Sequence, residues 1–256
     1  ETVATETHMK KQKISKRRVL TLGLALATCF APMKTLAQQF NVVGPGGGGA
    51  MFNATISPHD PSEVLVSCDM TGAYISRDGG HSWRMFNLRG TVKLFAFDPV
   101  QPKTIYAVTE GLWRSTDAGE SWKLVWPRPS TIQGIRMSSD HADETIVSDQ
   151  NALGQIVALA IDPTDSRTLV AGAVKDATTF AGIAKGGKAA VFLSRDEGAT
   201  WTKVRDLAEA PRKIWIDPRS DKGSRDLYVA GDSGMTVRVH GQWKNRPAPK
   251  GTVFND

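Results

Sequence analysis

The sequence has 256 residues, two cysteines and a formal net charge of +6. Residues 1–37 hold seven lysines and arginines against two glutamates, a net of +5, which leaves +1 for the other 219 residues. A nearly neutral body without a basic stripe argues against a surface that follows nucleic-acid phosphates, so we expect no nucleic-acid partner.

The N-terminal segment has the organisation of a secretory signal peptide. Residues 9–18 (MKKQKISKRR) are strongly basic, residues 19–32 form a short apolar run, and TLA at 35–37 is a small-residue cleavage site. The apolar run is too short for a comfortable membrane span. We expect cleavage after Ala37, with residues 1–37 removed, a secreted or periplasmic location, and no integral membrane span in the mature chain. A lipoprotein would use Cys29, but Thr28 before it fits that signal poorly.

The rest of the chain repeats one pattern four times. Each unit has an apolar run ending in Asp-Pro or Ser-Pro, a polar turn, a β-rich run, a loop, a third apolar run, a Gly-containing turn and a Trp-bearing strand. These features predict four short antiparallel strands per unit and show no helical period. The Ser-Pro or Asp-Pro steps begin at Ser57, Asp98, Asp162 and Asp217.

Repeated four-stranded units of this length predict an all-β chain folded as a β-propeller. A β-sandwich would not repeat its turn chemistry unit by unit. We place one propeller domain at 38–256, with blades near 41–87, 92–126, 156–205 and 212–246. Four blades close a ring only in the smallest class of propellers, so we expect the array to be incomplete at its C-terminus.

Three units share the turn Ser-x-Asp-x-Gly-x-Ser/Thr-Trp, at 76–83, 115–122 and 194–201. The Asp can accept hydrogen bonds from later backbone N–H groups, the Gly can take a positive φ, and the Trp can bury its ring between blades. Because the turn recurs, we expect a structural role for Ser76, Asp78, Gly80, Trp83, Ser115, Asp117, Gly119, Trp122, Ser194, Asp196, Gly198 and Trp201.

This turn resembles the Asp box, or BNR repeat, of sialidases, sortilin-type receptors, the xyloglucanases of glycoside hydrolase family 74 and a photosystem assembly factor. The fourth unit, HGQW at 240–243, keeps only the Trp. Sialidase activity would need an arginine cluster, and the sequence has no Arg-Ile-Pro element, so the family 74 resemblance is preferred.

Strand order separates two ends of each blade. The turn after the first strand and the Asp-box turn share one end, whereas the loop after the second strand and the crossover share the other. Asp69 therefore lies at the end opposite Asp78, together with the elaborated segments 126–155 and 175–188. Elaborated loops at one end of a rigid scaffold are typical binding sites.

The first unit also resembles the opening of family 74 enzymes, which have a Gly-rich strand, a His-Pro-containing turn and TD-x-GGAY. The matching residues are Gly46 to Gly49, Pro58, and Asp69 with Gly72, Ala73 and Tyr74. The resemblance implies that Asp69 is the general base of an inverting hydrolysis. Thr71 replaces the first glycine of GGAY, and the family's catalytic acid, which lies in a second propeller, has no counterpart here. A turn-forming Asp at a strand end is the alternative, since Asp232 is placed equivalently.

Other candidates carry weaker signals. Tyr74, Trp113 and Trp126 are candidate substrate-binding residues. The two tryptophans flank the loop-rich face and could stack on sugar rings if exposed, but packing between blades is the favoured use of their rings. Trp215 is expected in the core. The acidic segment 138–144 matches no zinc or calcium spacing, so we expect no metal and no cofactor.

Two functions from different classes remain open. The first is a secreted, glycoside-hydrolase-like propeller that acts on or binds polysaccharide through its loop-rich face; if it is an enzyme, it is an inverting hydrolase of O-glycosyl bonds. The alternative is a non-catalytic propeller scaffold that binds a protein or glycan partner.

Overall fold

The structure is a computed structural model that describes residues 44–45, 49–69, 72–137, 144–149, 153–176, 178–180, 183–185 and 187–250. The chain divides into two units, residues 1–42 and 43–256. The expected signal peptide, most of the Gly-rich stretch and most of the acidic segment 138–144 lie outside the described residues.

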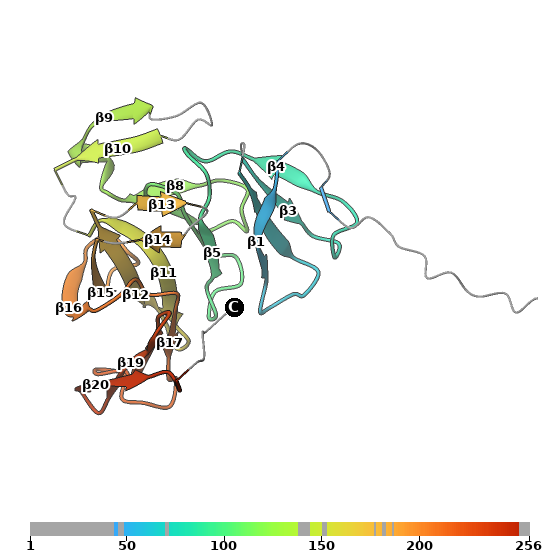
Figure 1. The fold of residues 1–256 in the computed structure, drawn as a ribbon. Coiled ribbons are helices and arrows are strands. Elements are labelled where there is room, and N and C mark those ends of the chain that lie inside the picture. The colour runs from blue at the N-terminus through green and yellow to red at the C-terminus, as the bar shows by residue number, and fades with distance from the viewer. Residues whose placement is uncertain are drawn as a thin grey trace, which may run out of the picture. The chain divides into compact units, whose positions relative to one another are not determined.

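The expectation of an all-β fold is confirmed. Four four-stranded antiparallel sheets follow one another, each with its strands in sequence order (Figure 1). We call them blades one to four. Their strands are β1 Met51–Ile56, β2 Val64–Cys68, β3 Ala73–Ser76 and β4 Arg84–Phe86; β5 Leu94–Phe97, β6 Ile105–Val108, β7 Leu112–Ser115 and β8 Lys123–Trp126; β11 Gln155–Asp162, β12 Asp165–Lys175, β15 Lys188–Ser194 and β16 Thr202–Leu207; β17 Lys213–Ile216, β18 Leu227–Ala230, β19 Gly234–Val239 and β20 Gln242–Pro247.

The two elaborated segments form small extra hairpins. One, in the crossover from blade two to blade three, pairs β9 (Ile132–Met137) with β10 (Glu144–Ser148) after a short 3₁₀ turn, η1 (Pro129–Thr131). The other pairs β13 (Thr178–Phe180) with β14 (Ile183–Lys185) in the loop after the second strand of blade three. Both additions lie at the loop-rich end of the blades.

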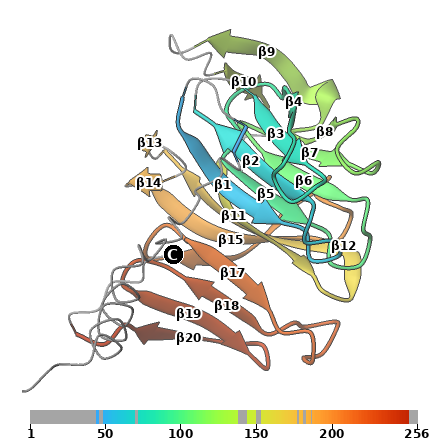
Figure 2. The ribbon, with the colours of Figure 1, turned by 90° about the vertical axis from the view of Figure 1, so that its right-hand side faces the viewer.

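The first strands of neighbouring blades contact one another: β1 with β5, β5 with β11, and β11 with β17. The sheets therefore stand side by side in chain order, as Figure 2 shows. Alternate residues of each first strand point to opposite faces of its sheet and so serve two neighbouring interfaces. In β5, Phe95 and Phe97 pack toward blade one, while Leu94 and Ala96 pack toward blade three.

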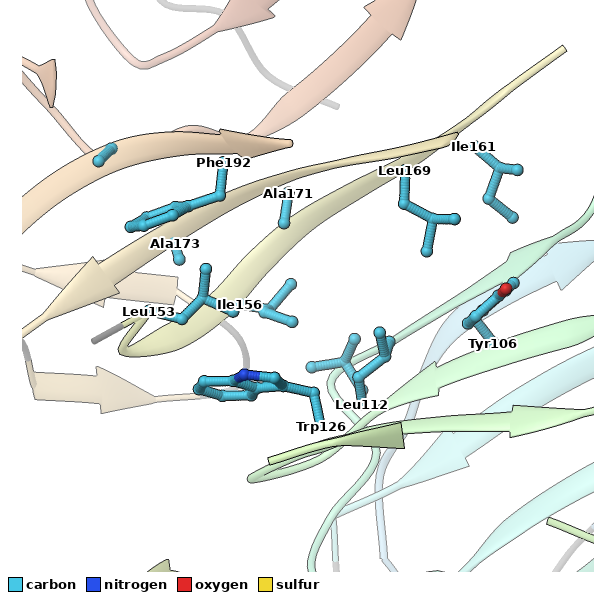
Figure 3. Close-up of a cluster of buried hydrophobic side chains, with 12 residues drawn as sticks. Tyr106, Leu112, Trp126, Leu153, Ile156, Ile161, Leu169, Ala171, Ala173 and Phe192 are labelled. Carbon is cyan, nitrogen blue, oxygen red and sulfur yellow. The ribbon is translucent and has the colours of Figure 1, made fainter. Parts of the chain in front are cut away.

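The core consists of apolar clusters between consecutive blades. The cluster between blades two and three includes Tyr106, Leu112 and Leu169 (Figure 3). Trp215 departs from the expectation that it belongs to the core, because its side chain is 46% exposed. Its neighbours Ile214 and Ile216 face blade three, so strand alternation turns Trp215 to the other face of blade four.

The three motif turns have one hydrogen-bond pattern. In the first, the Ser76 hydroxyl donates to Asp78 (2.8 Å) and accepts from the Gly80 N–H (2.8 Å). The Asp78 carboxylate also accepts from the Ser82 N–H (2.8 Å) and hydroxyl (2.6 Å). The turns at 115–121 and 194–200 repeat these bonds. This geometry supports the structural role that the sequence predicts for these residues.

Polar bonds join neighbouring blades at this same end. Arg77 of blade one donates to the Ala118 carbonyl (2.7 Å) and pairs with Glu120, both in the motif turn of blade two. Arg114 of blade two pairs with Glu197 in the motif turn of blade three. The motif turns of blades two and three thus close their own blades and also receive an arginine from the blade before.

Candidate functional site at the loop-rich end

Every blade places a carboxylate in the loop after its second strand. Asp69 follows β2, Glu110 follows β6, Asp176 follows β12 and Asp232 follows β18. These positions share the loop-rich end, because successive turns of an antiparallel meander alternate between the two ends of the sheet. The repeated fold therefore supplies one acidic side chain per blade at the end where the sequence predicts binding.

Two of these carboxylates are held by a cation from their own blade. Lys93, just before β5, pairs with Glu110. Arg212, just before β17, pairs with both oxygens of Asp232, at 2.6 and 3.1 Å. The hydrogen bond from Arg212 lowers the pKa of the Asp232 carboxyl from its usual range, and partial burial opposes this only in part. Glu110 and Asp232 thus anchor the loop to the incoming strand.

Asp69 is held differently. Its Oδ1 accepts the Ala50 N–H at 2.8 Å, and its own N–H donates to the Ala50 carbonyl at 3.1 Å. The buried Cys68 thiol lies 3.8 Å from the same oxygen. Within the described residues no lysine or arginine pairs with Asp69, and nothing bonds Oδ2. Asp69 is half-buried. Its carboxylate is fixed through Oδ1, and Oδ2 remains available to accept a hydrogen bond at the loop-rich end.

The expected sugar-stacking residues do not gather around Asp69. Trp126 is 8% exposed and packs in the core between blades two and three, which counts against sugar stacking in this structure (Figure 3). Trp113 packs against the cluster between blades one and two and donates its Nε1–H to Thr109 at 3.0 Å. Tyr74 lies opposite Val66 on the face of blade one that points away from blade two. The sheet of blade one therefore separates Tyr74 from Trp113.

A cavity that the sequence did not indicate lies beside blade four. It has a volume of about 290 Å³, and its lining includes Leu207, Glu209, Ser233 and Arg246. Glu209 accepts hydrogen bonds from the Ser233 N–H (3.0 Å) and hydroxyl (2.8 Å). Glu209 lies in the crossover, which the repeats do not share, so no repeated pattern marks it.

Other site chemistry is limited. Among the described residues, no group of three or more His, Cys, Asp or Glu side chains is placed to hold a metal ion. In the same part of the chain, no helix has the length and apolarity needed to cross a membrane. Of the acidic segment 138–144, the described Glu144 pairs with Arg89 at 3.0 Å.

The consecutive four-stranded blades, joined through their first strands, define a β-propeller that resembles those of glycoside hydrolase family 74. No protein-family model matches the chain. The xyloglucanase Xgh74A of Acetivibrio thermocellus is 27% identical over 201 residues, which cover 71% of this chain and 20% of that protein. The chain thus spans about a fifth of the length of the curated relatives it matches.

Two solved structures share the fold. An ancestral GH74 enzyme matches with a TM-score of 0.55 and 20% identity, over 82% of this chain and 25% of the other. The protein YCF48, solved bound to a D1 peptide, matches with a TM-score of 0.51 and 13% identity, over 82% of this chain and 57% of the other. At these identities the likeness concerns the fold, and it confirms the expected propeller architecture.

Proposed function

We propose that the protein acts on or binds polysaccharide through its loop-rich end. In this proposal the carboxylate of Asp69 contacts the sugar. The sequence similarity to a xyloglucanase, which extends over 71% of the chain, supports polysaccharide as the substrate class. The observation that carries the proposal is the state of Asp69, which is held by the Ala50 N–H and not by a cation. A carboxylate fixed through one oxygen presents the other to a hydroxyl group or to water.

The chemistry of inverting hydrolysis requires two carboxyl groups. A base takes a proton from the attacking water, while a protonated acid on the other side of the bond protonates the leaving oxygen. Asp69 suits the base, because its Oδ2 accepts no bond from the described residues. Asp232 does not suit the acid, because its bond to Arg212 lowers its pKa and keeps it charged. Glu110 is likewise paired with a cation, so hydrolysis would require an acid other than Glu110 and Asp232.

The test compares the unaltered chain with Asp69→Asn on a panel of polysaccharides that includes xyloglucan. Calorimetry measures binding, and release of reducing ends measures hydrolysis. We expect binding that weakens in Asp69→Asn, and loss of any hydrolysis. Asp60→Asn is the matched control, because Asp60 lies in the first turn at the opposite end and should leave both unchanged. No binding to any polysaccharide would overturn the function, whereas equal behaviour of Asp69→Asn would overturn only the role of Asp69.

A non-catalytic scaffold that binds a protein is the second candidate. It is favoured by the pairing of Glu110 and Asp232 with cations, which leaves the loop-rich end poor in catalytic carboxylates among the described residues. A propeller of the same fold, YCF48, was solved with a peptide bound. Failure of the whole polysaccharide panel, with a folded protein, would favour this candidate.

We also propose that the protein is secreted. Support comes from the order of basic, apolar and small residues over 9–37. Expression in a bacterial host followed by N-terminal sequencing of the exported protein should give a chain that begins at Gln38. A cytoplasmic product with residues 9–37 intact would contradict secretion.

A further inference from the structure

In blades two to four, one residue of the third strand faces the preceding blade, two positions before the motif serine or its counterpart. In blades two and three this residue is aromatic, Trp113 and Phe192. Trp113 packs against the cluster shared with blade one, and Phe192 lies in the cluster shared with blade two, where it is 8% exposed. Blade four has Thr236 at this position, so its junction with blade three lacks the aromatic ring.

The strand pairing establishes that these positions are equivalent. Thr236 pairs with Val229 of the second strand, and Val229 belongs to the cluster between blades three and four. Since cross-strand partners share one face of a sheet, Thr236 also points toward blade three. The aromatic residues hold the same place in their own blades, where Trp113 pairs with Ala107 and Phe192 pairs with Ala171.

The outer strand of blade four shows a similar change. Trp113 pairs with Leu124 in blade two, whereas Thr236 pairs with Asn245 in blade four. The Thr236 hydroxyl donates to Asn245 Oδ1 at 3.2 Å, and nothing among the described residues accepts from Asn245 Nδ2. A hydroxyl and an amide therefore stand in the junction of blades three and four where the junction of blades one and two has two apolar side chains.

The cavity of about 290 Å³ lies at the place of these changes. Thr236 and Asn245 line it from blade four, and Leu207 and Pro211 line it from the end of blade three and the crossover that follows. Leu207 and Val229, which also lines the cavity, both pack in the cluster between blades three and four. The cavity is therefore part of a junction between two described blades.

Glu209 supplies a fixed carboxylate at this cavity. Its Oε1 accepts from the Ser233 N–H at 3.0 Å and from the Ser233 hydroxyl at 2.8 Å, whereas Oε2 accepts the N–H alone, at 3.1 Å. A Cβ on Gly231 would lie 2.3 Å from Oε1, so glycine at this position makes room for the carboxylate. Arg212 holds the same loop through Asp232. Oε2 thus keeps a free lone pair for a further hydrogen bond.

We propose that this cavity binds one sugar ring, either the branch of a glycan or a free monosaccharide. Leu207, Pro211 and Val229 offer apolar surface to the C–H groups of the ring. Asn245 Nδ2 can donate to a ligand, and Glu209 Oε2 can accept from one. Neighbouring hydroxyl groups, each a donor and an acceptor, match this pair of groups. The Glu209 carboxylate disfavours an anionic ligand by charge repulsion.

The size of the cavity agrees with a single ring. Pockets for drug-sized ligands usually measure about 300–1,000 Å³, and the volume of about 290 Å³ lies just below this range. The sugar occupies the position that an aromatic ring fills in blades two and three. The inference rests on the proposed function, which supplies the glycan, and adds a second contact to it, because Asp69 of blade one does not line the cavity.

Nuclear magnetic resonance of the full chain tests the site directly. Amide spectra are recorded while xylose, arabinose, glucose, galactose or a xyloglucan oligosaccharide is added in increasing amounts. We expect at least one sugar to shift the signals of the Ser233 backbone N–H and the Asn245 side-chain amide. A shift with the oligosaccharide alone identifies a glycan branch as the occupant, and a shift with a free sugar shows that one ring is sufficient. Absence of both shifts with every sugar would overturn the proposal.

Two substitutions remove the site in different ways. Thr236→Phe fills the cavity with the ring that Phe192 supplies in blade three, so the Ser233 signal should no longer shift. Asn245→Leu removes the amide and should weaken binding about tenfold, the effect of one or two hydrogen bonds. Lys244→Leu is the matched control and should bind like the unaltered protein, because Lys244 is the neighbouring exposed residue of β20, lies on the opposite face and does not line the cavity.

The outcome is separable from that of the proposed function. Asp69→Asn should leave the Ser233 shift unchanged, and a loss of polysaccharide binding in Asp69→Asn then concerns Asp69 alone. If Thr236→Phe and Asn245→Leu bind every sugar as tightly as the unaltered protein, the cavity site is overturned while the role of Asp69 stands. Circular dichroism must show that each variant keeps its strand content, and Asn245→Leu decides the test if Thr236→Phe fails to fold.

Discussion

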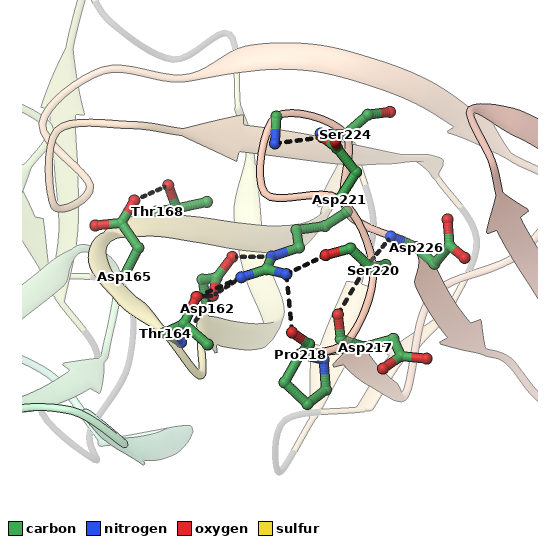
Figure 4. A network of polar contacts seen from close by, with 12 residues as sticks. Asp162, Thr164, Asp165, Thr168, Asp217, Pro218, Ser220, Asp221, Ser224 and Asp226 are labelled. Atoms are coloured by element: carbon green, nitrogen blue, oxygen red, sulfur yellow. Dashed lines mark hydrogen bonds and ion pairs between the residues drawn. The ribbon is translucent and has the colours of Figure 1, made fainter.

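Arg225 of blade four and Asp162 of blade three form a bidentate ion pair, with nitrogen–oxygen distances of 2.6 and 3.0 Å (Figure 4). The two side chains are 5% and 2% exposed. Arg225 also donates to the Pro218 carbonyl at 3.0 Å and to the Ser220 carbonyl, so its charge is satisfied within the fold. The pair therefore fixes the first turn of blade four against that of blade three.

The first prediction concerns this pair. Arg225→Met leaves the Asp162 carboxylate buried without its cation, and losing one partner of a buried pair costs about 3–5 kcal/mol of unfolding free energy. The double variant Asp162→Leu/Arg225→Met buries no charge and should lose clearly less than Arg225→Met alone. Urea denaturation of the three proteins measures the difference. Equal stability of Arg225→Met and the unaltered protein would contradict a structural role for the pair.

The second prediction concerns the serine of the motif turn. The Ser115 side chain is 1% exposed, accepts the Gly119 N–H at 2.8 Å and donates to Asp117 at 2.7 Å. Ser115→Ala leaves the Gly119 N–H buried without its acceptor, which should reduce the unfolding free energy by about 1–3 kcal/mol. Ser62→Ala removes a hydroxyl bonded only locally to Asp60 and serves as the control. If Ser115→Ala and Ser62→Ala lose the same unfolding free energy, the buried bond between Ser115 and the Gly119 N–H contributes no more stability than an exposed local bond.

The blades were predictable from sequence because the information is local and repeated. Each motif turn closes through bonds within four residues of its Asp or Ser, and the same letters occur three times. The alternation of side chains along a strand said less about which face is buried. Both faces of an inner strand pack against apolar neighbours, so polar and apolar residues do not alternate there. Ile214, Trp215 and Ile216 are all apolar, so the sequence did not show that only Trp215 faces away from blade three.

The state of the candidate site was harder to predict, because its contacts join distant residues. Asp69 and Asp232 look alike as acidic residues after a second strand. The structure separates them through partners 19 and 20 residues away, the Ala50 N–H for Asp69 and the Arg212 guanidinium for Asp232. A backbone N–H leaves no trace in a sequence pattern. The sequence placed Trp126 beside the binding face and favoured blade packing over sugar stacking, but the direction of its ring depends on distant residues of the next blade.

The third prediction is a loss of stability in acid. Hydrogen bonds from the Ser82 hydroxyl and N–H and from Ser76 lower the pKa of Asp78 from 3.8 to about 2. In Asp196, burial raises the pKa, but the bonds from Thr200 outweigh it and the pKa is lowered. A carboxyl group whose pKa is lower in the folded state stabilises the fold above its unfolded pKa and loses this effect as the pH falls through the folded value.

The melting temperature should therefore decline as the pH falls from 3.8 toward 2, measured by circular dichroism in buffers of constant ionic strength. Asp78→Asn is less stable at neutral pH but lacks one titrating carboxylate, so its melting temperature should decline less steeply over the same range. An equal slope in Asp78→Asn and the unaltered protein would show that the acid loss arises elsewhere.

The fourth prediction compares two glycines of the motif turns. Gly198 has a φ of +90°, and a Cβ there would lie 2.6 Å from Leu112 Cδ2 of the preceding blade. Gly79 has a φ of +71°, but the nearest atom to its Cβ would be His81 Nδ1, at 3.9 Å. Ala118 and Glu197 hold the place of Gly79 in the other two turns, with φ of 58° and 60°, so the turn accepts a side chain there.

Gly79→Ala should consequently be almost neutral, since its strain is small and it loses less chain entropy on folding than glycine does. Gly198→Ala has a similar backbone change but also forces Leu112 out of its place in the core between blades two and three, which should reduce the unfolding free energy by about 1–3 kcal/mol. Thermal and urea denaturation of the two variants, made in the same background, measures the difference. Because the backbone change is alike in both, a large loss in Gly198→Ala alone would show that the motif turn is also a packing surface between blades, and equal losses would refute that role.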